Sequence, residues 1–401
     1  MNGVAVIGAG PVGVICGLAL AQNGIPVVIF EKEPKPLVDQ RAASIHPPTL
    51  EMLHKLGVYE EILSKGLVSA IYRFHDRLTD SVVAEFDLND LKDEFQFPFV
   101  LQYEQYKLTD SVSAMCRDRS DIVFHFGHEL IDAKQDSDSV TIQVKGPDGI
   151  EQRQFDYLIG CDGGRSTVRK LSGIEFEGFT YPERFIKIAT HFDFGKASSN
   201  IVYRNYFSDP DEWCNLFKVR GQTEDGLWRA IMPVKADETD QQALEPDAIE
   251  ERLQRLYPNQ GRFEIEYVNI YDVHQRVAKT FRSGRILLAG DSAHVNNPIG
   301  GMGMNGGIHD AINLAEKLTR VLKGEDDRLL DAYDRQRRHV AIEYVQAQTI
   351  NNKRLLEERD PSVRQRNLDE LRQLADDPDR SRSYMRRASL LESLKSAAAI
   401  E

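Results

Sequence analysis

The chain has 401 residues, of which 41% are hydrophobic and 28% are charged, and its formal net charge is −13. This length predicts two or three domains, and the composition excludes a disordered chain, a collagen-like repeat and a disulfide scaffold. Asp and Glu together number 63, against 50 Lys and Arg. That balance argues against a surface for nucleic acid or anionic membranes, because both need clustered positive charge.

Cysteine and histidine spacing excludes further classes of protein. Four cysteines lie far apart without a CxxC pair, and the ten histidines show no HxH or HExxH spacing. We therefore expect no metal site and a reducing, cytoplasmic location. Residues 4–21 are uncharged and reach the lower length limit of a membrane-spanning helix, but four glycines and Pro11 interrupt them. A buried strand, a tight turn and a buried helix explain this stretch better than a membrane span.

The first candidate site follows the strand expected at residues 4–7. Residues 8–13 match the GxGxxG fingerprint, and a helix is expected from about Pro11 to Asn23. In this motif the first glycine permits a tight turn, the second lets the backbone approach a pyrophosphate, and the third lets the helix pack closely on the strand. The helix N-terminus directs N–H groups at the phosphates. The candidate cofactor-binding residues here are Gly8, Gly10, Pro11, Val12 and Gly13.

A carboxylate that could hold a ribose follows at the expected distance. The next strand, residues 25–30, leads to Glu31, eighteen residues beyond Gly13, with Lys32 beside it. An acidic side chain there binds ribose hydroxyls and repels a 2′-phosphate, so FAD or NAD is favoured over NADP. Arg41 and His46 lie on the following loop. Arg41 is a candidate phosphate contact, because an acidic protein needs local cations around a pyrophosphate.

The middle of the chain predicts short elements and a second candidate site. Helices are expected at residues 49–57 and 106–117. The apolar run at residues 157–160 leads into Asp162, Gly163 and Arg165, and such strand-to-helix junctions bind ligands in open α/β sheets. Antiparallel strands around a hairpin turn at residues 147–149 are expected at residues 122–126, 139–145 and 152–158.

Alternating apolar and polar positions predict a mixed or antiparallel sheet inserted between residues 173 and 281. Its expected strands lie at residues 185–192, 201–207, 213–219, 227–233 and 263–271, with a helix at about residues 245–257. Beyond about residue 347 the sequence is rich in Arg, Asp, Glu and Leu. That composition predicts amphipathic helices that cap the fold or meet a partner chain.

The third candidate site is a glycine-rich loop before a helix that ends at Leu322. A buried strand leads to Gly290 and Asp291, and the loop follows. Residues 301–306 also match GxGxxG, but a polar loop rather than a strand precedes them, so we do not predict a second nucleotide fold. A planar ring could approach backbone N–H groups there, which would stabilise negative charge on a reduced cofactor. The candidate residues of the loop are Pro298, Gly301, Gly303, Met304 and Asn305.

Together the three segments resemble the single-component, group A flavoprotein aromatic hydroxylases, which share the p-hydroxybenzoate hydroxylase fold. The resemblance covers about residues 1–344 and implies non-covalently bound FAD. It implies that the first motif binds the ADP half of FAD, that the Asp162 segment contacts FAD and the pyridine nucleotide, and that Gly290 and Asp291 hold the ribityl chain. The glycine-rich loop would flank the isoalloxazine. Arg41 and Gln102 match positions that contact FAD in this family.

The fold class implied is α/β, with a Rossmann-type FAD-binding domain, an inserted β-sheet substrate domain and C-terminal helices. The expected bounds are residues 1–72, 100–172 and 277–346 for the FAD-binding domain, 73–99 and 173–276 for the substrate-binding domain, and 347–401 for the helical segment.

The resemblance also implies an activity. NADH or NADPH would reduce FAD, O₂ would form a flavin C4a-hydroperoxide, and its distal oxygen would pass to a phenolic or heteroaromatic ring, in a monomer or homodimer. A side chain that assists deprotonation of a phenol is then valuable. The candidates for this catalytic role are His46, His191, Tyr203 and Tyr206.

Four other functions stay open at this point. Residues 41–57 resemble the phenol-hydroxylase and polyketide-hydroxylase branch, and isoprenoid-quinone hydroxylases share the three motifs. Flavin-dependent halogenases carry a WxWxIP segment, whose nearest match here, residues 228–233, lacks the second tryptophan. A non-catalytic FAD-binding protein would have no need for the glycine-rich loop.

Overall fold

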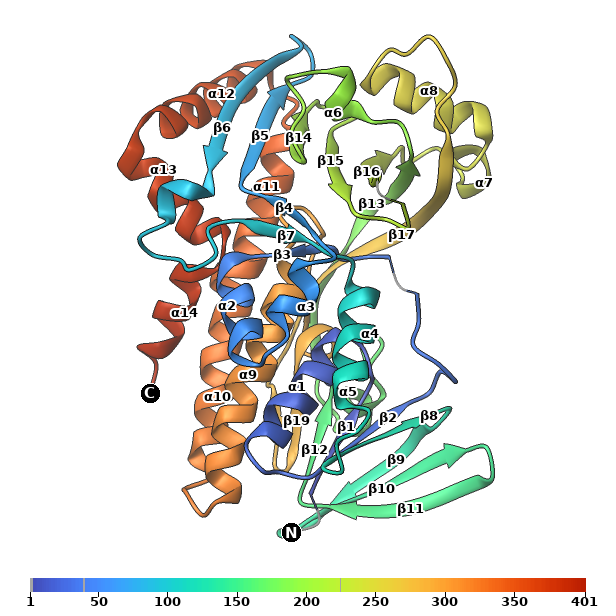
Figure 1. Ribbon diagram of the computed structural model, residues 1–401, viewed down its shortest axis with the longest axis vertical. Coiled ribbons are helices and arrows are strands. Elements are labelled where there is room, and N and C mark those ends of the chain that lie inside the picture. Colours follow the sequence, from blue (N-terminus) through green and yellow to red (C-terminus); the bar gives the residue numbers. More distant parts are fainter. Residues whose placement is uncertain (1–2, 39, 224) are drawn as a thin grey trace.

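The computed structural model describes residues 3–38, 40–223 and 225–401. A six-stranded sheet of order β18-β19-β12-β1-β2-β8 forms its lower half in Figure 1. Its central strands, β1 (Val4–Ile7), β2 (Val27–Glu31), β12 (Tyr157–Gly160) and β19 (Ile286–Leu288), are parallel, while β18 (Arg282–Ser283) is antiparallel. Helices α1 (Pro11–Gln22), α4 (Gln105–Cys116) and α9 (Met302–Leu322) pack together beside it. These strands are almost wholly apolar because helices cover the sheet that they form.

Strand β8 (Ile122–Phe126) corrects the sequence prediction. It pairs in parallel with β2 and completes the six-stranded sheet, so its predicted antiparallel pairing is wrong. Helix α4 returns the chain along the sheet, and a strand that follows such a crossover enters parallel. A separate sheet contains β9 (Glu129–Gln135), which the sequence prediction missed, with β10 (Val140–Gly146) and β11 (Gly149–Phe155). Gly146 faces Gly149 across the predicted hairpin turn.

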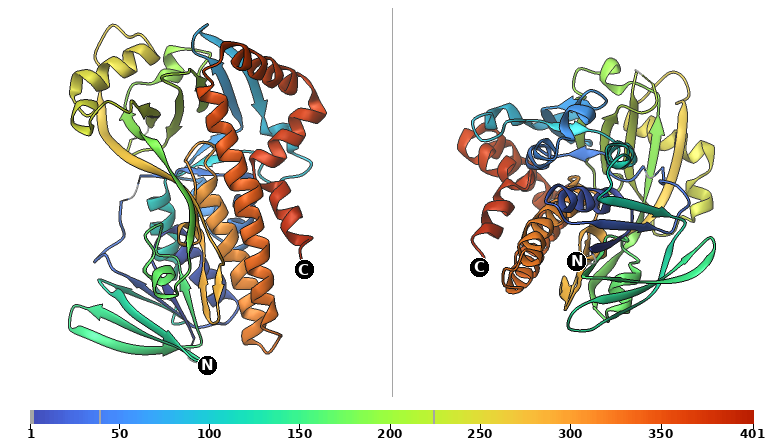
Figure 2. Two further views of the ribbon diagram at one scale, coloured as in Figure 1. Left: turned by 180° about the vertical axis from the view of Figure 1, so that it is seen from behind. Right: turned by 60° about the horizontal axis from the view of Figure 1, so that its bottom comes forward.

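A mixed eight-stranded sheet forms the upper half of Figure 1, in the order β20-β17-β13-β16-β15-β14-β5-β6. All of its pairings are antiparallel except that of β14 with β5. Figure 2 shows that the two longest strands, β13 and β17, run down toward the six-stranded sheet. The bounds are β5 Ile71–Asp76, β6 Ser81–Asp87, β13 Phe176–Thr190, β14 Arg204–Ser208, β15 Cys214–Val219, β16 Leu227–Val234, β17 Ile265–Ala278 and β20 His294–Val295.

Side chains alternate between the two faces of this sheet. Tyr206 and Phe217 belong to one apolar cluster, and their neighbours Phe207 and Leu216 belong to another. Helix α8 (Pro246–Leu256) covers the second face. The first face is turned toward the small sheet of β3 (Ser44–Ile45), β7 (Val100–Gln102) and β4 (Leu67–Ser69), and toward the C-terminal helices.

The C-terminal part is helical, as the sequence predicts. Helix α10 (Arg328–Val340) continues through a π-helical turn (Ala341–Gln346) into α11 (Ala347–Glu357), and Figure 2 shows these segments as one long rod. Helix α12 (Pro361–Asp376) packs against β6, and α13 (Pro378–Ala388) packs against a 3₁₀ turn (Leu88–Leu91). Helix α14 (Leu391–Ala398) packs against α10.

Several short helices complete the chain. The predicted helix at residue 49 begins earlier, at Pro47, because proline is favoured in the first turn of a helix.

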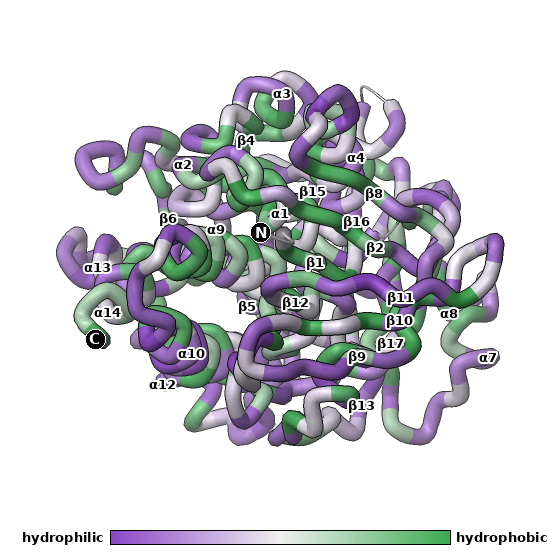
Figure 3. The backbone as a smooth tube through the Cα atoms, turned by 90° about the horizontal axis from the view of Figure 1, so that it is seen from below, coloured by the Kyte–Doolittle hydropathy of each residue, from purple (hydrophilic) through white to green (hydrophobic). Residues whose placement is uncertain are grey.

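Figure 3 shows hydrophobic residues along β1 and α1 and hydrophilic ones along α12 and α13. Within the described residues, no helix combines the length and apolarity needed to cross a membrane. The remaining short helices are α2 (Pro47–Lys55), α3 (Tyr59–Leu63), α5 (Thr167–Leu171), α6 (Phe194–Ala197) and α7 (Asp240–Ala243).

Candidate active site

The fingerprint glycines have different surroundings. Gly8 has φ +102°, and a Cβ atom there would lie 2.5 Å from the Cys161 carbonyl oxygen. A Cβ atom on Gly13 would lie 2.0 Å from the Gly8 carbonyl oxygen, whereas one on Gly10 would meet no heavy atom within 4 Å. The fold itself therefore requires Gly8 and Gly13, while the backbone at Gly10 is open. Helix α1 begins there without a side-chain cap or an acidic residue in its first turn, which suits an anionic pyrophosphate.

The carboxylate of Glu31 lies at the end of β2, beside the glycine turn. It accepts hydrogen bonds from the backbone N–H of Ala9 at 2.8 Å and of Glu33 at 3.0 Å. Its neighbour Lys32 is exposed and lies 4.0 Å from Glu33. The position of Glu31 next to the turn fits the predicted contact with a ribose.

Asp162 organises its own loop. Its half-buried carboxylate accepts hydrogen bonds from the Ser166 hydroxyl and from the backbone N–H groups of Thr167, at 2.7 Å, and Val168, at 3.1 Å. Burial raises the pKa of the Asp162 carboxyl, and these donors offset that rise only in part. The carboxylate thus shapes the start of α5. The backbone at Gly163, with φ +80°, and the exposed Arg165 are the parts of this loop left to face a ligand.

Two predicted FAD residues from distant parts of the chain lie together. Arg41 Nη1 is 3.6 Å from Asp291 Oδ2, although 250 residues separate them in the sequence. Gly290, just before Asp291, has φ +66°, and a Cβ atom there would lie 2.8 Å from a methyl group of Val12. The loop at Gly290 therefore packs directly on the first turn of α1, so the first and third motifs form one surface.

Asp310, on helix α9, anchors the loop at Gly290. Its buried carboxylate accepts hydrogen bonds from the Gly290 backbone N–H at 3.0 Å, from His294 Nε2 at 2.8 Å and from Arg337 Nε at 2.6 Å. Burial favours the neutral acid, but Arg337 and His294 outweigh it and lower the pKa of Asp310 to about 2. The charged carboxylate fixes the Gly290 loop to α9 and α10.

We expect Asp310→Asn to lower the free energy of unfolding by about 3–5 kcal/mol, because it leaves Arg337 buried without its counter-charge. The purified variant should also hold less flavin, since the Gly290 loop loses its anchor. Denaturant unfolding and the flavin-to-protein absorbance ratio measure both effects. The control Asp326→Asn removes an exposed carboxylate that pairs with Arg328 and should change neither value. Equal stability of the Asp310 variant and the wild type would contradict this role.

The glycine-rich loop lies against β3 and β7. Asn305 binds it there, because Asn305 Nδ2 donates to the carbonyl oxygens of Gly301, at 2.7 Å, and Ser44, at 2.8 Å. Asn305 Oδ1 accepts from the backbone N–H of His46 at 2.9 Å. Gln102 accepts from the Ser44 hydroxyl at 2.8 Å, and its Nε2 is buried without a hydrogen-bond partner. Such an unsatisfied donor fits a polar ligand between Gln102 and the loop.

The other predicted residues of the loop shape its turn. The backbone N–H of Gly301, whose φ is +67°, donates to the Pro298 carbonyl oxygen at 3.0 Å. Met304 is buried in the first turn of α9, and a Cβ atom on Gly303 would lie 3.2 Å from Asn296 Oδ1. Helix α9 starts without a side-chain cap or an acidic residue in its first turn, so its N–H groups can face an electron-rich ring.

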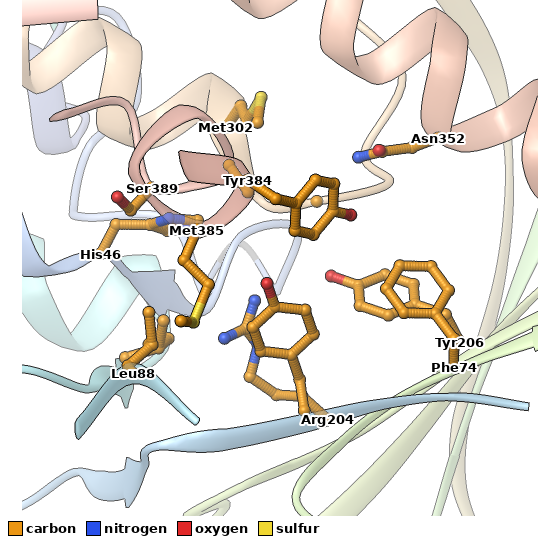
Figure 4. A pocket seen from close by; sticks show the side chains of 14 residues that line it. His46, Phe74, Leu88, Arg204, Tyr206, Met302, Asn352, Tyr384, Met385 and Ser389 are labelled. Carbon is orange, nitrogen blue, oxygen red and sulfur yellow. The ribbon is translucent and has the colours of Figure 1, made fainter. Parts of the chain in front are cut away.

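A cavity opens between this loop, the eight-stranded sheet and helix α13. Figure 4 shows His46 and Met302 on one side, Phe74 and Tyr206 on the other, and Arg204 reaching in from β14. The lining residues are His46, Tyr72, Phe74, Leu88, Val100, Arg204, Tyr206, Gly300, Met302, Asn352, Tyr384, Met385, Ala388 and Ser389.

Three polar side chains of the cavity have unsatisfied atoms, namely His46, Tyr72 and Arg204. Both ring nitrogens of His46 and the Tyr72 hydroxyl are buried without a hydrogen-bond partner. Burial and then the nearby charge of Arg204 lower the pKa of His46 to about 3. Burial also raises the pKa of Tyr72 well above its usual range. At neutral pH the cavity therefore presents a neutral imidazole, which can accept a hydrogen bond, and a neutral phenol, which can donate one.

Two of the four predicted catalytic candidates line this cavity. His46 and Tyr206 do so, whereas His191 pairs with Glu266 at 3.2 Å and Tyr203 lies beside Trp228, toward the opposite face of the sheet. The alternation of side chains explains this split, because Tyr203 and Tyr206 are an odd number of residues apart. Sequence reasoning missed Arg204, Tyr72 and Tyr384. Only Arg204 could have been found from the local sequence, because it lies two residues before Tyr206 and its side chain therefore faces the same side of the strand.

The glycine turn, the joined loops and the open helix N-termini define a dinucleotide-binding α/β protein with a flavin-type site beside an aromatic cavity. The chain matches the model of the FAD binding domain family over residues 1–348. It is 32% identical over 371 residues to para-nitrophenol 4-monooxygenase of Pseudomonas sp. strain WBC-3, covering 91% of this chain and 89% of the relative. It is also 29% identical to 6-hydroxy-3-succinoylpyridine 3-monooxygenase of Pseudomonas putida strain S16, covering 97% and 98%.

The crystal structure of p-nitrophenol 4-monooxygenase from Pseudomonas putida DLL-E4 superposes with a TM-score of 0.92 at 30% identity, covering 98% of both chains. The chain therefore belongs to the FAD binding domain family and is an FAD-dependent aromatic hydroxylase. The predicted family, fold class and FAD cofactor are confirmed.

Proposed function

We propose that the protein uses NADH or NADPH and O₂ to hydroxylate a small, single-ring phenolic or hydroxylated heteroaromatic compound in the cavity beside Gly300 and Met302. The observation that carries this proposal is the neutral His46 in an aromatic-lined cavity next to the flavin-type loop, where its ring nitrogens form no hydrogen bond. The names of both curated relatives describe single-ring compounds, a nitrophenol and a hydroxypyridine.

The residues that would hold FAD follow from the geometry. The open backbone at Gly10 and the first turn of α1 suit the pyrophosphate, Glu31 the ribose, and Arg41 with Asp291 the ribityl side. Gln102 Nε2 and the start of α9 suit the isoalloxazine edge. When bound there, FAD supplies the redox chemistry that activates O₂.

The cavity side chains would prepare the aromatic ring. The neutral imidazole of His46 would accept a hydrogen bond from a phenol hydroxyl, which makes the ring more electron-rich for oxygen transfer. The apolar lining, which includes Phe74, Leu88 and Met385, excludes water from the reacting atoms. The domain bounds predicted from the sequence, a cytoplasmic setting and a monomer or homodimer remain part of this proposal.

The competing substrate classes fit this cavity less well. A polyketide or an isoprenoid quinone is larger than one ring, and helix α13 forms one wall of the cavity with Tyr384 and Met385. In the segment compared with halogenases, Trp228 packs on the far face of the sheet and donates to Asp193 at 3.1 Å. No lysine lines the cavity in the part of the chain that the structure describes.

Turnover with matched substrates tests the proposal. The FAD-loaded protein is mixed with NADH or NADPH under ¹⁸O₂, with single-ring phenols, hydroxypyridines, a short-chain quinone precursor and a tetracyclic phenol. We expect single-ring compounds to accelerate NAD(P)H oxidation and to gain one labelled oxygen by mass spectrometry. Oxidation without labelled product for every single-ring compound would reject the proposed substrate class.

A further inference from the structure

Arg204 is a buried cation whose charge nothing in the described chain balances. The residue is 7% exposed, and its Nη1 atom is buried without a hydrogen-bond partner. No carboxylate among the residues that the structure describes forms an ion pair with it. Its guanidinium instead lies over the Tyr72 ring, 4.9 Å from the ring centroid. A buried charge without a partner is costly, so this arrangement needs an explanation.

The other buried arginines of the described chain all have oxygen partners. Arg337, Arg364 and Arg252 pair with the carboxylates of Asp310, Asp76 and Glu238. Arg169 donates to the carbonyl oxygens of Ser292 and Gly164, and Arg229 donates to the backbone and side-chain oxygens of Gln40. These contacts show how the fold stabilises a guanidinium that it uses only for structure. Arg204 differs from them in a second respect, because it reaches into a cavity rather than into packed protein (Figure 4).

The groups around Arg204 are also those of an anion site. The Tyr72 hydroxyl and the His46 ring lack partners in the same cavity, and the rest of the lining is largely aromatic and aliphatic. We propose that Arg204 binds a negatively charged oxygen of the aromatic substrate, so that the cavity selects anionic rings over neutral rings of equal shape. A guanidinium binds such oxygens through charge-assisted hydrogen bonds, which are stronger in a dry cavity. This inference rests on the proposed function for the location of the substrate.

The anionic oxygen could be a phenolate or a ring carboxylate, and two ligand pairs distinguish them. The oxidised FAD-loaded protein is titrated without NAD(P)H, so that no turnover occurs, and Kd is read from the flavin absorbance. One pair is 4-nitrophenol, at a pH where it is ionised, with 4-nitroanisole; the other is benzoate with benzamide. We expect the anion of at least one pair to bind about 10- to 100-fold more tightly than its neutral partner, as for hydrogen bonds to a charged group.

Variants then assign the preference to Arg204. Arg204→Met should raise Kd for the anion about 10- to 100-fold and leave Kd for the neutral partner unchanged, while Arg204→Lys should keep part of the preference. Arg204→Met should also raise the Tm of the ligand-free protein, because it removes an unbalanced buried charge. A purely structural arginine would lower Tm instead. The control is Arg73→Met on the adjacent strand β5, where Arg73 already pairs with Glu85 at 2.6 Å.

Equal binding of anionic and neutral ligands by the wild type, or a preference that survives in Arg204→Met, would overturn the inference. Its failure is separate from failure of the proposed function, because binding is measured without turnover. Labelled product from neutral rings alone would keep the hydroxylase proposal and reject the anion site. A strong anion preference without any labelled product would keep the anion site and reject the hydroxylase proposal.

Discussion

Gly10→Ala is expected to weaken FAD binding about 10- to 100-fold while leaving the stability of the flavin-free protein unchanged. The added Cβ atom meets nothing in the protein within 4 Å, and the φ of −73° suits alanine. The methyl group would instead project where the backbone approaches the pyrophosphate, and one excess methyl in a packed contact costs about 1–3 kcal/mol. Gly13→Ala should instead destabilise the protein itself, because its Cβ atom would lie 2.0 Å from the Gly8 carbonyl oxygen. The flavin-free protein should then lose more than about 3 kcal/mol of its free energy of unfolding.

Two measurements separate these outcomes. Equilibrium denaturation of the flavin-stripped proteins gives stability, and quenching of FAD fluorescence on addition of protein gives Kd. Gly261→Ala is the matched control, since a Cβ atom on that exposed glycine would have only Asn259 Nδ2 nearby, at 3.9 Å, and the residue lies far from the fingerprint in sequence. If Gly10→Ala bound FAD as tightly as the wild type, the pyrophosphate would not lie over Gly10.

The local motifs could be predicted because their chemistry depends on residues close together in sequence. The spacing from Gly8 to Gly13 dictates a turn and a helix start whatever the rest of the chain does, and the next strand then delivers Glu31 at a set distance. The Gly290 loop was found in the same way. Its contact with Val12 and the pairing of Arg41 with Asp291 join segments far apart in the chain, so no local pattern predicts them.

The substrate cavity could not be predicted, because distant segments build it. Its walls come from β5, β7, β14, the residue after β3, the loop before α9, α11 and α13, and no local pattern reports which strand face will meet which helix. His46 and Tyr206 were therefore named together with His191 and Tyr203. The predicted antiparallel direction of β8 was wrong for a similar reason. The direction of this strand depends on the crossover through α4 rather than on residues 122–126 themselves.

His46 should stay a neutral hydrogen-bond acceptor over the whole physiological pH range. Its pKa of about 3 keeps the imidazole neutral from pH 5 to pH 8, so the wild-type kcat should show no acidic limb near 6.5 from this residue. The same low pKa makes the imidazole too weak a base to take the proton of a phenol. His46→Gln, which removes the accepting ring nitrogens, should lower kcat about 3- to 10-fold at pH values where the phenol is protonated, as expected for the loss of one hydrogen bond. The deficit should shrink as pH rises and substrate phenolate, which needs no acceptor, becomes abundant. A pH profile of kcat for both proteins measures this. A deficit that is constant with pH would indicate that His46 only shapes the cavity.

The same pKa shift predicts how the stability of the protein depends on pH, and a second buried histidine serves as the control. Between pH 6.5 and 3 the unfolded chain binds a proton at His46 that the folded chain does not, so stability is complete above pH 6.5 and falls with decreasing pH by up to about 1.4 kcal/mol per unit. His46→Gln should reduce that slope by one proton. His309, whose pKa burial also lowers to about 3, bonds to Thr49 and does not line the cavity. His309→Gln should therefore reduce the slope equally but leave the pH dependence of kcat unchanged, because only His46 faces the substrate.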